Sequence, residues 1–381
     1  MNIGVIGLGY GDEGKGLVVD ALAMRHPDSL VTRFSGGPQA AHTVYDEKYG
    51  YHIFSSFGAG TLRGLPTYLT KHVLVNPVLM AKELETLLDK GLTPQILINS
   101  KCPIITPFDI YSNQLDIDNL NHGSCGHGIY KTINREKDHY HLLAEDLYCK
   151  TALKIKLELI REYYKSLIPI EMLFEFTNAV DTLINYSDFK VVETDYVPFL
   201  GDIIFEGSQG LLLDPEIGFF PHCTPSRLDL TNIIEVIEGD LDMLYLVTRA
   251  YHSRHGNGIL STENIPNNIK DNPYETNKTN TFQGEFRRGI LDLDLVQYAK
   301  DKSNVKYANN ITLVITHMDL VQDELRLIYK QQIETFTKEI DFIKFISKAL
   351  EIENVLISKS PYSKDLNEYV LIDGKTIEEC Q

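Results

Sequence analysis

The first twenty residues pass from an apolar run into a glycine-rich polar turn. Residues Asn2–Leu8 are mostly apolar, which predicts a short strand buried on both faces. The turn that follows, residues 9–16, reads GYGDEGKG, and the apolar pattern of residues 17–22 predicts the start of a helix. Exposed backbone N–H groups and the helix dipole converge at such a turn. This stretch therefore predicts a site for an anion.

Four later apolar runs have the same form, because each ends in a polar or glycine-containing stretch. They span residues 202–205, 243–248, 311–315 and 354–357. In parallel α/β sheets, ligands bind beyond the carboxyl ends of the strands. We therefore predict an α/β fold with a large central, mostly parallel sheet flanked by helices. The polar stretches are expected to meet the glycine turn in one crevice.

Between Thr151 and about Asn185 the apolar positions follow a helical pattern among charged residues, including Ile155 and Leu159. We interpret this segment as part of a mainly helical insertion, around residues 100–200, in one domain that spans residues 1–381. Its apolar stripe is expected to serve packing. Residues 264–281 are polar, rich in asparagine and interrupted by proline, which predicts an exposed loop.

Composition and charge narrow the choice of partners. The formal net charge is −17, which disfavours nonspecific binding to a nucleic-acid backbone. The five cysteines are scattered and lack metal-ligand spacing, as expected for reduced thiols in the cytoplasm. No signal peptide is expected before the first strand, and no apolar run is long enough to span a bilayer. We therefore expect neither nucleic acid nor membrane as a partner.

The glycine turn has the spacing of a phosphate-binding loop with one exception. Gly9, Gly14 and Lys15 fit that spacing, but Gly16 stands where a Ser or Thr hydroxyl would bind Mg²⁺. A metal bound here needs another oxygen ligand. Asp12, inside the turn, is the natural candidate.

Further motifs, taken in order along most of the chain, resemble the adenylosuccinate synthetase family. Its patterns GDEGKG, GGxNAGHT, FEGAQGxLLD, YPYVT and TKLD correspond to residues 11–16, 36–43, 205–214, 220–224 and 316–319. The resemblance implies a Mg²⁺-dependent ligase. A nucleoside triphosphate phosphorylates the 6-oxygen of a purine nucleotide, and the amine of L-aspartate then displaces that phosphate.

The resemblance also implies residue roles. Catalysis would fall to Asp12 as base at purine N1, to His42 at the transferred phosphoryl group, to Lys15 as phosphate cation and to Gln209 at the base edge. The Mg²⁺ ligands would be Asp12 and Ala41. The triphosphate itself would contact Gly11, Glu13, Gly14, Lys15, Gly16, His42 and Thr43. Its base would contact His317, Asp319, Ser358, Ser360 and Pro361.

For the purine monophosphate, the implied contacts are Asp12, Gln39, Ser124, Cys125, Arg135, Gln209 and Thr224. For aspartate, they are Phe282, Gln283, Gly284 and Arg287. Arg135 matches an arginine that reaches into the neighbouring subunit's site, which implies a homodimer. Cys125 is equally well explained as a small buried thiol.

Three departures from the family pattern bear on the substrates. Gln39 replaces an asparagine near the nucleotide, and Glu285 replaces an arginine expected near the ribose hydroxyl and aspartate. Losing that arginine suggests that the 2′-OH is not read. His317 replaces a lysine near guanine of GTP, and the loop 358–361 lacks a glycine before Pro361. Both changes weaken selectivity for GTP and leave ATP or dATP open.

This pattern is similar to the phage-encoded 2-aminoadenylosuccinate synthetases, which use dGMP on the route to diaminopurine. Such an enzyme would work in the host cytoplasm. Some members of that branch replace the loop aspartate, whereas this chain keeps Asp12. We favour dGMP or GMP, with IMP as the alternative. The alternative from a different functional class is a nucleotide-binding switch without ligase chemistry.

Overall fold

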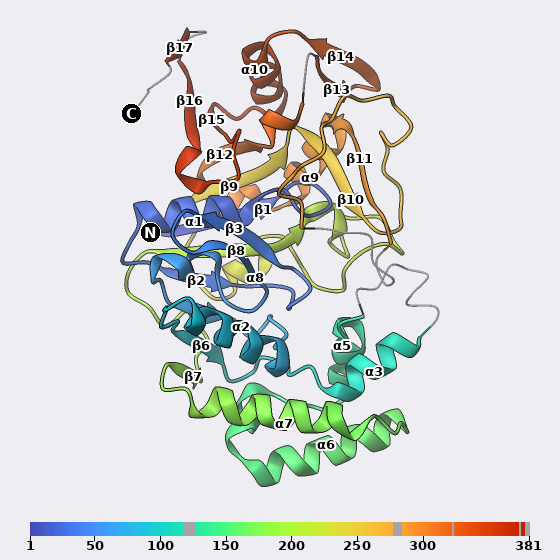
Figure 1. Cartoon of the computed structure of the whole chain (residues 1–381). Coiled ribbons are helices and arrows are strands. Elements are labelled where there is room, and N and C mark those ends of the chain that lie inside the picture. The colour runs from blue at the N-terminus through green and yellow to red at the C-terminus, as the bar shows by residue number, and fades with distance from the viewer. Residues whose placement is uncertain (117–125, 277–283, 322–323, 373–374, 378–381) are drawn as a thin grey trace.

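A single large sheet crosses the protein (Figure 1). The structure is a computed structural model, and it describes residues 1–116, 126–276, 284–321, 324–372 and 375–377. Within these residues the sheet has eleven strands. In spatial order they are β17 (Lys375–Ile377), β16 (Asn367–Ile372), β15 (Asn354–Ile357), β12 (Ala308–Thr316), β9 (Leu241–Arg249), β1 (Asn2–Gly7), β8 (Ile203–Gly210), β2 (Leu30–Arg33), β5 (Thr67–Leu69), β6 (Ile96–Asn99) and β7 (Phe189–Val192). Neighbours from β15 to β7 are parallel, and β16 and β17 are antiparallel. The predicted α/β class is confirmed.

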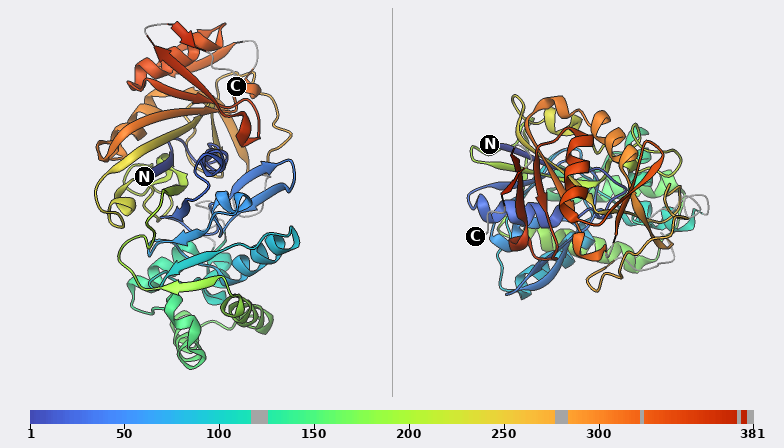
Figure 2. Two further views of the ribbon diagram at one scale, coloured as in Figure 1. Left: turned by 90° about the vertical axis from the view of Figure 1, so that its left-hand side faces the viewer. Right: turned by 90° about the horizontal axis from the view of Figure 1, so that it is seen from above.

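Two smaller sheets and the helices complete the fold (Figure 2). The smaller sheets are β10 (Tyr251–His255), β11 (Phe286–Asp292), β13 (Leu325–Tyr329) and β14 (Gln332–Phe336), and the hairpin of β3 (His42–Asp46) and β4 (Gly50–Phe54). The helices are α1 (Lys15–Arg25), α2 (Pro77–Asp89), α3 (Pro107–Leu115), α5 (Ile129–Lys137), α6 (Lys150–Tyr164), α7 (Ile170–Asn185), α8 (Thr231–Ile234), α9 (Leu293–Lys302) and α10 (Glu339–Leu350). No helix among the described residues is long and apolar enough to cross a membrane.

Strand β1 lies at the centre of the sheet, between β8 and β9. Ile3 and Val5 belong to the apolar core on one face, and Ile6 belongs to the core on the other. This alternation is what a strand covered on both faces requires. The central position places the turn after β1 where strands from both halves of the chain end.

The segment predicted to be helical forms α6 and α7, which lie at the opposite end of the molecule from α10 (Figures 1 and 2). Leu153, Leu157 and Ile160 of α6 are buried, one helical turn apart. Ile155 and Leu159, counted in the predicted stripe, are instead 55% and 46% exposed, since they lie on the other side of the helix. The chain then returns to the sheet as β7.

Two of the polar stretches that follow predicted strands are themselves extended. Strand β8 continues through Gly210, with Glu206 opposite Val5 and a register shift before Gly210 pairs with Gly7. A side chain at Gly210 would bring its Cβ within 2.0 Å of the Glu13 carboxylate. Glycine there lets β8 run beside the turn. Residues 251–255 likewise form β10, which pairs with β11.

Candidate functional site

The turn after β1 leads directly into α1, as predicted. Gly14 is the N-cap of α1, with φ of 91°, and contributes no side-chain cap. The first backbone N–H groups of an α-helix have no partner within the helix. Because the N-cap residue makes no side-chain hydrogen bond to them in the described part of the chain, this helix start can receive an anion.

The Glu13 side chain is hydrogen-bonded to other residues of its own turn. One carboxylate oxygen accepts hydrogen bonds from the N–H groups of Gly9 (3.1 Å) and Gly11 (2.9 Å). The other accepts a hydrogen bond of 2.5 Å from Lys15 Nζ. Burial alone would raise the pKa of Glu13, but Lys15 and the backbone donors hold the pKa below its ordinary value. The Glu13 carboxylate thus shapes the turn, and it ties down the lysine predicted to meet phosphate.

A cavity of about 290 Å³ opens beside this turn. It brings together the two sets of residues predicted to hold the triphosphate and its base. They come from the turn and α1 (Asp12, Glu13, Gly14, Lys15, Gly16), from the start of β3 (Ala41, His42, Thr43) and from the ends of β12 and β15 (His317, Asp319, Ser358, Ser360, Pro361). Among the predicted triphosphate contacts, Gly11 alone does not line this cavity.

Asp12 lines the cavity next to a cation that the sequence did not reveal. Arg249 is buried and directly ends β9, and its Nε donates a hydrogen bond of 2.5 Å to the Asp12 carbonyl. Burial raises the pKa of Asp12, and the charge of Arg249 works against that rise. The sequence shows only that Arg249 is a basic residue at the carboxyl end of a predicted strand. That this strand lies beside β1 follows from the strand order in the structure.

The loop predicted at residues 264–281 contributes a wall of the cavity through residues 272 and 274–276. Tyr45 donates a hydrogen bond of 2.8 Å to the carbonyl of Tyr274. Glu275 lies 3.5 Å from the Arg249 guanidinium. This acidic wall faces the same cation as Asp12. The part of the loop from residue 277 lies outside the described residues.

His42 lies at the start of β3 and is held by two acceptors on β8. Its Nδ1 is 2.5 Å from a carboxylate oxygen of Glu206, and its Nε2 is 3.1 Å from the carbonyl oxygen of Ser208. A Cβ on Gly16 would lie 2.8 Å from the His42 Cβ. The residue that departs from the phosphate-loop pattern therefore makes room for the histidine.

Two predicted purine contacts carry buried polar atoms that have no hydrogen-bond partner among the described residues. They are both side-chain polar atoms of Gln39 and Oε1 of Gln209. Buried polar groups in folded proteins are nearly always hydrogen-bonded, so unpaired ones mark places where a ligand can bind. Thr224, another predicted purine contact, is also buried, and its backbone N–H donates a hydrogen bond to the Leu213 carbonyl. Ser124 and Cys125 lie outside the described residues.

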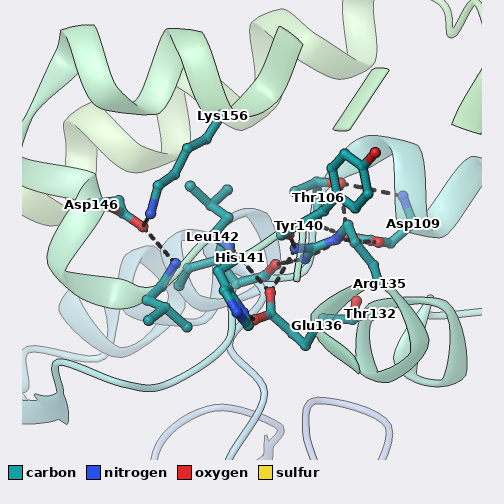
Figure 3. A network of polar contacts seen from close by, with 12 residues as sticks. Thr106, Asp109, Thr132, Arg135, Glu136, Tyr140, His141, Leu142, Asp146 and Lys156 are labelled. Atoms are coloured by element: carbon teal, nitrogen blue, oxygen red, sulfur yellow. Dashed lines mark hydrogen bonds and ion pairs between the residues drawn. The ribbon is translucent and has the colours of Figure 1, made fainter. Parts of the chain in front are cut away.

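Arg135 does not have the exposed guanidinium that its predicted role requires (Figure 3). It is completely buried, and Asp109 accepts hydrogen bonds from its Nε (2.9 Å) and from one terminal nitrogen (3.2 Å). Its other N–H groups go to Glu136 and to the carbonyls of Tyr140 and Ile104. All five donors of Arg135 are thus used inside one chain. A reach into a neighbouring subunit does not fit this arrangement.

The predicted aspartate loop is only partly described. Phe282 and Gln283 lie outside the described residues, and Gly284 has a left-handed backbone with φ of 83°. Arg287 donates to Glu263 (2.7 Å) and to the carbonyls of Gly256 and Gly258. In this arrangement Arg287 ties two loops together at the edge of β11.

The cavity can accept a hard divalent cation. Asp12 and Ala41 both line it, beside the helix start that suits phosphate. Among the described residues there is no group of three or more His, Cys, Asp or Glu side chains placed to hold a metal ion. Mg²⁺ commonly binds through one or two carboxylates together with phosphates and water, so this sparse donor set fits Mg²⁺.

Comparisons with known proteins agree with one another. The family model for adenylosuccinate synthetase matches residues 4–368. Adenylosuccinate synthetase of Francisella tularensis subsp. tularensis strain SCHU S4 is 29% identical over 398 residues, covering 96% of this chain and 88% of its own. The enzyme of subsp. novicida strain U112 is 27% identical over 406 residues, covering 98% and 90%.

Two solved structures share the fold. Fully ligated adenylosuccinate synthetase from Plasmodium falciparum has a TM-score of 0.77 at 18% identity, covering 96% of this chain and 98% of that one. Succinoaminodeoxyadenylate synthetase of cyanophage S-2L, bound to dGMP and to dATP as an energy donor, has a TM-score of 0.62 at 16% identity, covering 96% and 95%.

Proposed function

The chain belongs to the adenylosuccinate synthetase family of carbon–nitrogen ligases, which use aspartate and a nucleoside triphosphate, and we propose that its purine substrate is dGMP or GMP. The product is then 2-amino-deoxyadenylosuccinate, or its ribose counterpart, for the synthesis of diaminopurine nucleotides. The observation that carries the proposed chemistry is the position of Asp12, in one cavity with the phosphate-binding helix start and His42.

The proposed reaction has two steps. Asp12 accepts the N1 proton of the purine while O6 attacks the γ-phosphorus of the triphosphate, so that the O6–phosphorus bond forms and the diphosphate leaves. The amine of L-aspartate then attacks C6, and the C6–O6 bond breaks with loss of phosphate. Guanine and hypoxanthine present the same O6 and N1–H edge, so this chemistry applies equally to dGMP, GMP and IMP.

The other residues of the site have distinct tasks in this proposal. Lys15 and the first N–H groups of α1 hold phosphate. His42 donates to the transferred phosphoryl group, and Gln39 and Gln209 bond the purine edge. Mg²⁺ held by Asp12 and Ala41 would neutralise charge on the phosphates.

We assign the triphosphate to ATP or dATP on the basis of His317. The Thr316 hydroxyl donates to the Glu13 carbonyl at 2.7 Å, so it has only its oxygen left to accept from His317 Nδ1 at 2.8 Å. Burial and the charge of Arg249 hold the pKa of His317 well below its ordinary value. The ring is therefore neutral, with a lone pair on Nε2. A lone pair suits the 6-amino group of adenine and repels the 6-oxygen of guanine.

A guanine monophosphate is favoured by the sequence departures rather than by the fold. Glu285, which replaces the arginine expected near the ribose, is exposed. The cyanophage enzyme in the comparison was solved with dGMP, but fold similarity at 16% identity is shared with the Plasmodium enzyme and does not choose a purine. Retention of Asp12 favours the second candidate, IMP-dependent adenylosuccinate synthesis.

A substrate panel tests the proposal. The purified chain with Mg²⁺ and L-aspartate is given IMP, GMP or dGMP, each with ATP, dATP or GTP, and phosphate release is measured with and without aspartate. We expect aspartate-dependent turnover with dGMP or GMP and with adenine donors. Turnover with IMP alone would overturn the purine assignment and keep the family chemistry.

The variant Asp12→Asn separates a ligase from a nucleotide-binding switch. It removes the proposed base and keeps the size of the side chain, so we expect a loss of at least about 100-fold in turnover with ATP binding retained. A wild-type chain that binds ATP and gives no purine product with any substrate would instead support the switch.

A further inference from the structure

The charges that line the cavity include a cation to which the proposed reaction gives no task. In the described part of the chain, the lysine and arginine side chains that line the cavity are Lys15 and Arg249. The carboxylates that line it are those of Asp12, Glu13, Glu275 and Asp319. A nucleoside triphosphate brings further negative charge into this cavity. The cations of the cavity must therefore meet its phosphates if it is to bind.

Lys15 is already paired with a carboxylate. Its Nζ lies 2.5 Å from a carboxylate oxygen of Glu13, and both side chains are almost completely buried. Because Nζ carries three hydrogens, Lys15 can still donate a hydrogen bond to a phosphate. The Lys15–Glu13 pair, however, brings no net charge to the cavity. Among the described residues that line the cavity, a fixed positive charge without such a short ion pair is left to Arg249.

Arg249 is held in place through two of its three nitrogens. Nε donates a hydrogen bond of 2.5 Å to the carbonyl of Asp12, and one terminal nitrogen donates a hydrogen bond of 2.7 Å to the Tyr251 hydroxyl. The Arg249 side chain is only 4% exposed. Asp12 lies two residues before Gly14, the N-cap of α1, so these contacts fix the guanidinium beside the helix start. A planar guanidinium held in this way is well suited to bind phosphate.

The remaining terminal nitrogen of Arg249 faces a carboxylate that a phosphate could replace. It lies 3.5 Å from an oxygen of Glu275, a longer contact than the two hydrogen bonds of the other nitrogens. The next residue, Thr276, has its hydroxyl 3.2 Å from that of Thr43, a predicted triphosphate contact. Carboxylate and phosphate oxygens bind guanidinium groups in the same way. Glu275 therefore holds the place on Arg249 that a phosphate oxygen would take.

We propose that Arg249 binds a phosphate group of the nucleoside triphosphate, and that Glu275 competes with this phosphate for the guanidinium. Binding of the triphosphate then exchanges one anionic partner of Arg249 for another, and the Glu275 carboxylate turns away from the incoming charge. The inference rests on the proposed ligase function for its choice of ligand. Its structural basis is the pair of contacts that fix Arg249 and the looser contact with Glu275.

Equilibrium binding tests the inference without the reaction. Isothermal titration calorimetry with Mg²⁺, and without purine monophosphate or aspartate, measures the affinities for ATP, for GTP and for their nucleosides. We expect Arg249→Gln to weaken binding of the preferred triphosphate by about 10- to 100-fold, the equivalent of one charged hydrogen bond. Binding of the nucleoside should not change. Arg249→Lys, which keeps the charge and loses the planar fork, should lie in between. Equal losses for triphosphate and nucleoside would overturn the inference.

Glu275→Gln should have the opposite effect. It removes the competing charge and keeps the size of the side chain, so triphosphate affinity should rise by about 2- to 5-fold, the equivalent of a partly exposed ion pair. Asp271→Asn is the control, because Asp271 is an acidic residue of the same segment that pairs with Arg288 and does not line the cavity. Its triphosphate affinity should equal that of the wild type. An unchanged or lower affinity in Glu275→Gln would contradict the competition.

Arg254→Gln is the control for the loss of a buried arginine. Arg254 is 2% exposed, lies five residues after Arg249, and donates to the carbonyls of Asn257, Ile259 and His222. It does not line the cavity. We therefore expect Arg254→Gln to bind the triphosphate as the wild type does. A loss as large as that of Arg249→Gln would show that any buried arginine has this effect, and would overturn the assignment.

These measurements separate the inference from the proposed function. A chain that binds ATP or GTP through Arg249 and gives no purine product would overturn the ligase function and keep the inference. A ligase whose triphosphate affinity does not depend on Arg249 would overturn the inference and keep the function. A chain that binds neither triphosphate would also overturn the inference. If Arg249→Gln does not fold, Arg249→Lys and Glu275→Gln decide, and wild-type affinity in both would overturn the inference.

Discussion

The Arg249 guanidinium donates a hydrogen bond of 2.5 Å to the backbone carbonyl of Asp12. Asp12 has a left-handed backbone, with φ of 60°, which a non-glycine residue adopts only when its surroundings support it. The same guanidinium lowers the pKa of the Asp12 carboxyl against the effect of burial. One cation therefore supports both the shape of the turn and the charge of the proposed base.

Replacing Arg249 should move the acidic limb of activity. Without the charge of Arg249 the pKa of Asp12 rises further. Because Asp12 must be ionised to act as a base, the enzyme should lose activity at a higher pH than the wild type when the pH is lowered. We expect the acidic limb of kcat/KM for Arg249→Gln to lie at higher pH than in the wild type. Arg249→Lys, which keeps the charge, should stay close to the wild-type limb. Identical limbs in Arg249→Gln and the wild type would contradict this role.

His317 should control the choice of triphosphate. A lysine at this position donates hydrogen bonds and cannot accept them. We therefore expect His317→Lys to lower the ratio of kcat/KM for ATP to that for GTP by about tenfold, the equivalent of about one good hydrogen bond. Competition assays with both donors measure the ratio. A ratio that stays the same, or rises, would show that His317 does not read the base.

Arg135 should matter for stability rather than for chemistry. Arg135→Met leaves Asp109 buried without its cation, so the free energy of unfolding should fall by about 3–5 kcal/mol. Lys131→Met is the control, because Lys131 pairs with Asp116 at a partly exposed position and should cost below about 1 kcal/mol. Denaturant unfolding measures both. Normal stability with lost turnover would instead favour the role across a subunit interface.

Gly16 should resist conversion to the usual phosphate-loop residue. Although serine at this position binds Mg²⁺ in phosphate loops, its Cβ here would lie 2.8 Å from the His42 Cβ. We expect Gly16→Ser to lower kcat by displacing His42, and Gly16→Ala to do the same, since both add the Cβ. Steady-state kinetics at saturating Mg²⁺ measures the effect. An increase in kcat for Gly16→Ser would contradict this explanation.

The features that could be predicted from the sequence are local or ordered along the chain. The strand, turn and helix at residues 2–25 follow from an apolar run, glycines at fixed spacing and a second apolar run. The residues predicted to contact the triphosphate come from motifs in a fixed order, and the structure brings almost all of them to one cavity, while their contact with a triphosphate stays a prediction.

The features that could not be predicted depend on which strands become neighbours. Arg249 meets Asp12 only because β9 lies beside β1, and Glu206 of β8 meets His42 of the separate hairpin across 164 residues of sequence. The predicted ligand contact of Arg135 rests on a loose match between motifs. In the structure Arg135 pairs with Asp109, which is 26 residues away and lies on another helix. Pairings of this kind are set by tertiary packing, which a single sequence does not display.

In the proposed reaction the purine 6-oxygen is phosphorylated and then leaves as part of phosphate. The most direct test uses dGMP labelled with ¹⁸O at O6, with ATP, Mg²⁺ and L-aspartate, and analyses the released phosphate by mass spectrometry. We expect one ¹⁸O atom in each phosphate, matched by formation of 2-amino-deoxyadenylosuccinate. Aspartate-dependent release of phosphate without ¹⁸O would contradict the proposed mechanism. Turnover of labelled IMP, with no turnover of dGMP or GMP, would contradict the proposed substrate.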